Sequence, residues 1–129
     1  MSDAEDIDDI REQKKEKLAE SVGSPGEPIH VDSEAHLEEI LEDSHLVLVD
    51  FYADWCGPCK MLEPTVEEIA AETDAAVAKV DIDALQNLAR EYQVQGVPTL
   101  YLFADGEVAD RMVGVQDKGT LVKKIEANA

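Results

Sequence analysis

The stretch LVLVDFYADWCGPCK, residues 46–60, decides the fold of this chain. Residues 46–52 form an almost continuous apolar run, which is typical of a strand buried on both faces of a sheet. Two cysteines separated by two residues follow. Residues 60–72 then repeat apolar side chains at helical spacing, at positions 62, 66, 69 and 70. The pattern therefore predicts a strand, a tight turn and a helix, with both cysteines at the turn.

The start of a helix favours a reactive cysteine. Its unpaired N–H groups and the positive end of its dipole stabilise a thiolate. We therefore expect Cys56 to be acidic and exposed, and Cys59, one turn further on, to be more shielded. Pro58 suits the first turn because it lacks an N–H group and has a preset φ. Two sulfurs at this spacing are able to close a small disulfide ring and to open it again.

A Cys-x-x-Cys pair is also found as half of a zinc site. Zinc usually takes four protein ligands, and the chain has no second cysteine pair. Its three histidines, His30, His36 and His45, lack ligand spacing. We therefore expect no metal here.

Residues 49–60, VDFYADWCGPCK, closely resemble the active-site segment of the thioredoxin family. The spacing of later features matches as well, so the resemblance covers residues 29–129. It implies an α/β thioredoxin fold, with a mixed central sheet of about five strands flanked by about four helices. It also implies thiol–disulfide exchange, in which Cys56 is the nucleophile and Cys59 the resolving thiol. The redox centre is then the cysteine pair itself, and no cofactor is implied.

Asp50 stands in the middle of the apolar strand. Desolvation there should raise its pKa, so that it could take a proton from Cys59 near neutral pH. In thioredoxins the matching aspartate lies buried behind the cysteines with this role, and a lysine on the adjacent strand is its neighbour. Lys79 fits that position. A structural carboxylate and a plain surface lysine are the alternatives.

The segment Val97-Pro98-Thr99 resembles the family loop in which the proline is cis and faces the cysteines. The backbone of Val97 would then pair with an extended substrate segment. The resemblance implies a substrate-binding surface made by Trp55, Gly57, Pro58, Gly96, Val97, Pro98 and Gly114. Core packing is the alternative for Trp55, and close backbone approach is the alternative for Gly114.

The remaining chain divides into an extension and further elements of the domain. Residues 1–28 are expected to be an acidic extension and linker, either a solvated helix or a docking arm, and residues 29–129 the domain. In the helix expected up to residue 42, capped by Asp32 or Ser33, we predict that Ala35, Leu37, Ile40 and Leu41 point inward. The other predicted strands are 29–31, 76–82, 97–103 and 107–113, and the other helices are 84–92 and 117–127.

The charge is unusual for a foldable chain of 129 residues. Thirty acidic and 11 basic side chains give a formal net charge of −19. Nucleic acid and anionic membrane surfaces are therefore not expected as partners, because their phosphates would be repelled. Residues 1–28 carry nine acidic and four basic side chains, which leaves 21 and seven for the remainder. This spread predicts adaptation to high salt, as in a halophilic archaeon.

These observations predict a cytoplasmic, monomeric protein-disulfide reductase. No stretch approaches the roughly 18 apolar residues of a membrane span, and two cysteines are too few for a disulfide-stapled secreted scaffold. The resemblance implies thioredoxin reductase and disulfide-containing proteins as partners. Two alternatives stay open, a disulfide oxidase or isomerase and a non-catalytic docking module.

Overall fold

The computed structural model describes residues 26–129. The helix or docking arm predicted for the acidic extension lies outside the described residues. The elements follow one another as β1 (Ile29–His30), α2 (Glu34–Asp43), β2 (Leu46–Tyr52), α3 (Gly57–Glu72), β3 (Ala76–Asp81), α4 (Gln86–Glu91), β4 (Thr99–Ala104), β5 (Glu107–Val113) and α5 (Lys118–Ala127).

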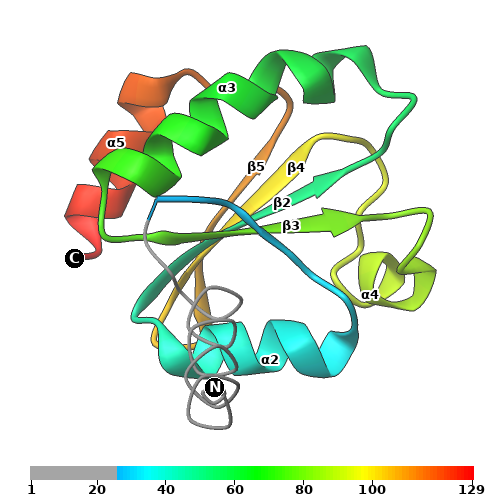
Figure 1. Ribbon diagram of the computed structural model, residues 1–129, viewed down its shortest axis with the longest axis horizontal. Coiled ribbons are helices and arrows are strands. Elements are labelled where there is room, and N and C mark those ends of the chain that lie inside the picture. The colour runs from blue at the N-terminus through cyan, green and yellow to red at the C-terminus, as the bar shows by residue number, and fades with distance from the viewer. Residues whose placement is uncertain (1–25) are drawn as a thin grey trace, which may run out of the picture.

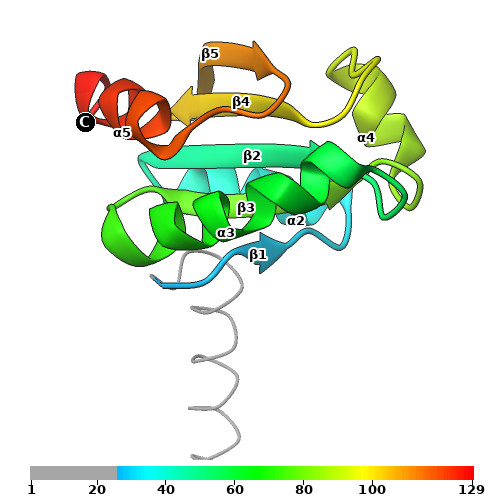
Figure 2. The ribbon, with the colours of Figure 1, turned by 90° about the horizontal axis from the view of Figure 1, so that it is seen from above.

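The five strands form one mixed sheet in the order β1-β3-β2-β4-β5. β1 and β2 run parallel to β3, whereas β4 is antiparallel to both β2 and β5. α3 and α5 cover one face of the sheet, and α2 and α4 lie on the other (Figures 1 and 2). The thioredoxin fold predicted from the sequence is therefore confirmed.

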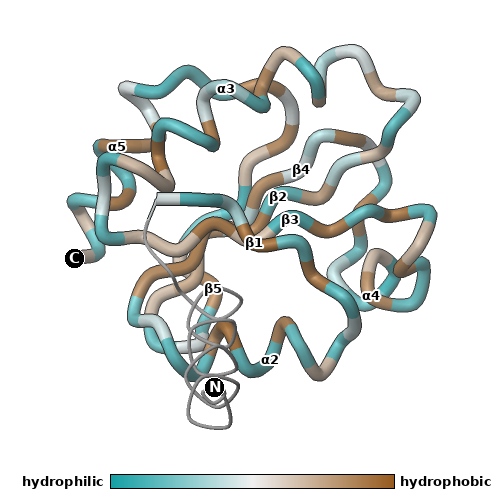
Figure 3. Tube along the Cα trace, viewed as in Figure 1, coloured by the Kyte–Doolittle hydropathy of each residue, from teal (hydrophilic) through white to brown (hydrophobic). Residues whose placement is uncertain are grey.

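β2 lies at the centre of the sheet and is buried on both faces. Its odd-numbered residues join the core beneath α2, and Leu46 and Leu48 join the core beneath α3 and α5. In Figure 3, brown hydrophobic segments lie along the strands of the sheet. Because side chains alternate along a strand, Asp50 belongs to the face covered by α3, where the cysteines also lie.

Local sequence signals account for most element ends. Ser33, one of the two predicted caps, accepts a hydrogen bond from the backbone N–H of His36 at 3.1 Å. Asp117 caps α5 in the same way through Thr120. The β4–β5 hairpin turns at Asp105 and Gly106, which both have positive φ as a tight two-residue turn requires.

Several predicted bounds differ from the structure by one or two residues, as at α4, which begins at Gln86 rather than at residue 84. Two wrong predictions have a clear local cause. Ala35 is exposed, whereas Leu37 and Ile40 are buried. Positions 35 and 37 are about 200° apart around a helix, so both cannot face the core. The strand predicted from residue 97 begins at Thr99, because the proline before it has no N–H to donate to a neighbouring strand.

Candidate active site

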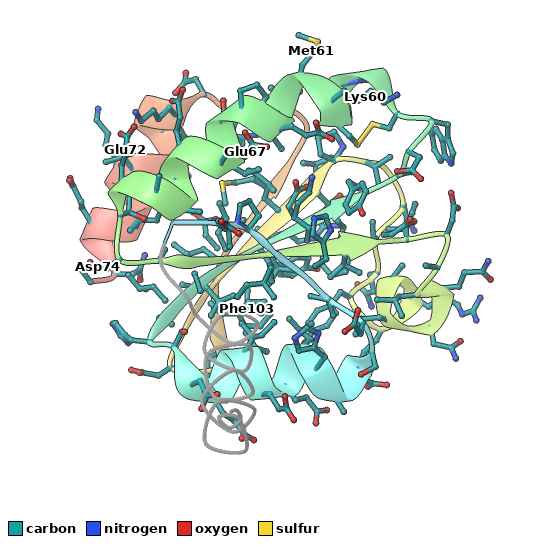
Figure 4. All side chains as sticks on the ribbon, viewed as in Figure 1. Lys60, Met61, Glu67, Glu72, Asp74 and Phe103 are labelled. Atoms are coloured by element: carbon teal, nitrogen blue, oxygen red, sulfur yellow. A yellow bond between two sulfur atoms is a disulfide. The ribbon has the colours of Figure 1, made fainter. Side chains whose placement is uncertain are left out.

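Cys56 and Cys59 form a disulfide at the N-terminus of α3. Their Cα atoms are 5.3 Å apart, and Figure 4 shows the disulfide next to Lys60. Cys56 is the N-cap of the helix, and its Sγ accepts a hydrogen bond from the N–H of Cys59 at 3.1 Å. The same N–H would stabilise a thiolate on Cys56 once the disulfide is reduced.

The expectation that Cys56 is exposed was wrong. Its exposed fraction is 4%, against 3% for Cys59. The reason lies in a distant loop, because the Sγ of Cys56 is 3.6 Å from the carbonyl oxygen of Val97, and Ala53 packs against both cysteines. Exposure therefore does not distinguish the two sulfurs in this oxidised state, whereas the cap position and the contact with Val97 do.

Asp50 is buried with an exposed fraction of 1%, and its Oδ1 has no hydrogen-bond partner among residues 26–129. Burial raises the pKa of Asp50 to about 6, the positive charge of Lys79 opposes this rise, and the negative charge of Glu63 adds to it. A carboxyl group with this pKa exchanges protons near neutral pH.

Lys79 lies beside Asp50 in the register of β2 and β3. It is buried, and its Nζ lies 3.8 Å from Oε2 of Glu63 and 4.5 Å from the centre of the Tyr52 ring. Lys79 is therefore shared between carboxylates on two elements that flank it.

Glu63 was missed by the sequence reasoning. It stands four residues after Cys59 on α3, so helical spacing places it on the same face of the helix. That spacing could have indicated Glu63, although the lysine it meets comes from a different element.

The loop before β4 lies against the disulfide. The Val97–Pro98 peptide bond is cis, as the family resemblance implied. The N–H of Gly114 donates a hydrogen bond to the carbonyl of Pro98 at 2.8 Å. Gly114 has a φ of 95°, which a residue with a side chain rarely adopts.

The other predicted surface residues surround the N-terminus of α3. Trp55 is 69% exposed, so it is not a core residue, and its Nε1–H donates to Asp83 at 2.8 Å. Gly57, Pro58 and Gly96 are also exposed. Met61, which sequence reasoning did not select, extends outward one residue after Lys60 (Figure 4) and is 71% exposed.

Comparison with known proteins identifies the family. The thioredoxin family model matches residues 27–127. The chain belongs to the thioredoxin family. It is 46% identical to thioredoxin of Mycobacterium tuberculosis over 99 residues, 75% of this chain and 85% of the relative. The solved structure of a single-site mutant of thioredoxin from Halobacterium salinarum is 55% identical with a TM-score of 0.79, and the match covers 81% of this chain and 92% of that one.

Another relative is named for both thioredoxin and thioredoxin reductase. The bifunctional thioredoxin reductase/thioredoxin of Mycobacterium leprae is 42% identical over 102 residues, which are 78% of this chain and 22% of that protein. Thioredoxins are protein-disulfide oxidoreductases, and the cysteine pair that this activity requires is present here as a disulfide. Family membership thus implies thioredoxin reductase and disulfide-containing proteins as partners.

The redox-active dithiol serves thioredoxins without a cofactor. Within residues 26–129, no three His, Cys, Asp or Glu side chains are grouped so that they could hold a metal ion. His36 accepts a hydrogen bond from the N–H of Asp32, and His45 is hydrogen-bonded to the carboxyl group of Asp105. In the same part of the chain, no helix is long and apolar enough to cross a membrane.

Proposed function

We propose that, in protein-disulfide reduction, Cys56 is the attacking nucleophile and Cys59 is the resolving thiol. The Cys56 thiolate attacks one substrate sulfur, the substrate disulfide breaks, and a mixed disulfide forms. The Cys59 thiolate then attacks the Sγ of Cys56. The intramolecular disulfide forms and the substrate leaves as a dithiol, so that two electrons pass from the cysteine pair to the substrate.

The observation that carries this assignment is the hydrogen bond from the Cys59 N–H to the Sγ of Cys56. A donor already directed at that sulfur lowers the free energy of a thiolate there. Cys56 is therefore the better nucleophile of the pair.

Asp50 takes the proton of Cys59 in the second step, and Lys79 adjusts the proton affinity of Asp50. The support for this role is the burial of Asp50, its unpartnered Oδ1 and its position on the face that α3 covers. Lys79 beside it favours the charged form of the carboxyl group, and Glu63 disfavours it.

The substrate contacts the exposed residues Trp55, Gly57, Pro58 and Gly96 and the half-buried Val97 and Gly114. Pro98, the remaining residue of the predicted surface, is buried. The carbonyl of Val97, 3.6 Å from the Sγ of Cys56, is in position to accept a hydrogen bond from an extended substrate segment. The exposed Trp55 offers apolar contact area beside the reactive sulfur.

The protein works in the cytoplasm, as a monomer, at high salt, and a thioredoxin reductase recycles it. The high-salt assignment is supported by the net charge of −19 and by the similarity to the Halobacterium salinarum thioredoxin. Carboxylates lie close together on the surface. The pKa of Glu91 is raised by a side-chain hydrogen bond that its protonated form donates to Glu34, and by the charges of Glu34 and Glu38. Light scattering coupled to size-exclusion chromatography would measure the mass of the protein in solution and so test whether it is a monomer.

We assign residues 1–28 to an extension and residues 29–129 to the domain. The family match over residues 27–127 supports this boundary. A chain shortened to residues 26–129 should keep its reductase activity. Loss of activity in the shortened chain would show that the extension is required for catalysis.

The test of the proposed function is reduction of insulin disulfides with dithiothreitol as electron donor. Wild type should be active in molar salt and Cys56→Ser should be inactive. Reduced Cys59→Ser, mixed with the substrate after dithiothreitol has been removed, should accumulate a mixed disulfide. A folded wild-type protein that reduces no insulin at any salt concentration would refute the proposal. A strongly oxidising redox potential would instead indicate an oxidase.

A further inference from the structure

Two arginines of the described chain line the same pocket. Arg90 on α4 and Arg111 on β5 are the arginines of residues 26–129. The pocket has a volume of about 680 Å³, and no carboxylate of the described residues lines it. Its lining residues are Arg90, Gln93, Val94, Gln95, Tyr101 and Arg111.

Neither guanidinium group is neutralised by a carboxylate of the described chain. Lys79, Lys118 and Lys124 each form an ion pair with Asp or Glu, whereas the side chain of Arg90 donates to the amide oxygen of Asn87. In a protein with 30 acidic side chains, these are two positive charges at one pocket that no carboxylate of the described residues pairs with. Guanidinium groups bind carboxylates with charge-assisted, often bidentate hydrogen bonds.

Arg111 is held in place for such binding. Its Nε–H donates to the hydroxyl of Tyr101 at 3.0 Å, and that hydroxyl donates to the carbonyl of Tyr92 at 2.6 Å. A second N–H group donates to the carbonyl of Gln93 at 3.4 Å, and the guanidinium lies over the Tyr101 ring. Because the side chain is already ordered, binding an anion costs less conformational entropy.

The loop before β4 connects the pocket with the reactive disulfide. Gln95 lines it, and two residues later the carbonyl of Val97 lies 3.6 Å from the Sγ of Cys56. Two residues span at most about 7 Å. A substrate segment that pairs with Val97 and continues along this loop toward Gln95 would meet the pocket a few residues from its cysteine.

We propose that the Arg90–Arg111 pocket binds a carboxylate side chain of the disulfide-containing partner protein. This inference rests on the proposed reductase function and adds a preference for acidic substrates. Inorganic phosphate, which offers similar oxygen acceptors, competes for the pocket.

The test uses two disulfide-bridged peptides that differ only in Glu or Gln about three to five residues from the cysteine, which is the reach of the pocket. The ratio of their kcat/KM values is measured at low salt. It does not depend on how much of a variant is folded, because both peptides meet the same sample. Wild type should prefer the Glu peptide about five-fold. Arg90→Gln and Arg111→Gln together should reduce the ratio to about one.

Lys123→Gln is the matched control, because it removes the same charge from an exposed position on α5. It should keep the preference, and inorganic phosphate should weaken the wild-type preference more than chloride at equal ionic strength. Equal ratios in wild type and the double variant would overturn the proposed role of the pocket, and so would loss of the preference in Lys123→Gln. In either case, reduction of the Gln peptide would still support the reductase function. Reduction of neither peptide would overturn the proposed function and, with it, this inference.

Discussion

At the scale of single residues, Asp50 combines a functional position with a cost to stability. Its pKa is about 6 in the folded protein and 3.8 in the reference state, so folding favours its protonated form. Below about pH 4 the group is protonated in both states and adds no penalty. Between about pH 4 and pH 6 the unfolded state loses this proton while the folded state keeps it, so stability falls by up to about 3 kcal/mol and levels off above pH 6.

Asp50→Asn should therefore stabilise the oxidised protein by about 2 kcal/mol at pH 8 and leave its stability near pH 4 almost unchanged. Denaturant unfolding at the two pH values measures this difference. The same variant should resolve a mixed disulfide at least about ten-fold more slowly at pH 7, because Cys59 loses its proton acceptor. A normal rate of resolution would remove Asp50 from the mechanism.

Glu63 competes with Asp50 for the charge of Lys79. Glu63→Gln should lower the pKa of Asp50 for two reasons. A negative charge is removed, and the positive charge of Lys79 is then no longer paired with Glu63. Carboxyl-carbon NMR titration of Asp50 follows this directly. Glu67→Gln, one turn further along α3 (labelled in Figure 4), is the control with the same change of charge. An equal shift in both variants would indicate general electrostatics rather than the Glu63–Lys79 contact.

At the scale of elements, one histidine links three segments of the chain. His45 precedes β2, its Nδ1 lies 2.7 Å from Asp105 in the β4–β5 turn, and its Nε2 lies 3.1 Å from the carbonyl of Asn128 after α5. Only the protonated ring donates both hydrogen bonds. The hydrogen bond to Asp105 raises the pKa of His45 above its usual value.

A raised histidine pKa adds stability that is complete below about pH 6.5 and lost as the pH rises through the folded-state pKa. His45→Gln should therefore lower Tm more at pH 6 than at pH 9. Thermal melts at both values, with His30→Gln as a control at an exposed strand position, measure the difference. A loss of Tm that is the same at both pH values would show that protonation of His45 does not matter.

Local patterns predicted the elements well, whereas the features of the site that were missed depend on contacts between distant segments. The apolar run of β2 and the Asp-Gly turn were sufficient to predict a central strand and a hairpin. The burial of Cys56 depends on Val97, 41 residues away, and no local pattern reports that contact. The pairing of Glu63 with Lys79 and the shared pocket of Arg90 and Arg111 likewise arise only when the sheet and its helices assemble.

At the scale of the whole molecule, the excess of negative charge opposes folding. Compaction brings like charges together, as the raised pKa of Glu91 beside Glu34 shows. Salt screens this repulsion, since the Debye length falls from about 10 Å at 0.1 M to about 3 Å at 1 M. The ion pairs of Lys118 and Lys124 weaken under the same screening. With a net charge of −19, we expect the repulsion to outweigh these few attractions.

The Tm of the protein should therefore rise by at least about 5 °C between 0.1 M and 1 M KCl, which corresponds to about 1 kcal/mol for a domain of this size. A variant with Gln in place of four exposed carboxylates of α2, Glu34, Glu38, Glu39 and Glu42, should be more stable at low salt and gain less from KCl. Because exclusion of a solute from the protein surface also stabilises, sucrose serves as an uncharged comparison that should not distinguish the two proteins. If Tm stays constant in KCl, or if both proteins respond equally, screening of surface charge is not what stabilises the fold, and the assignment to high salt fails.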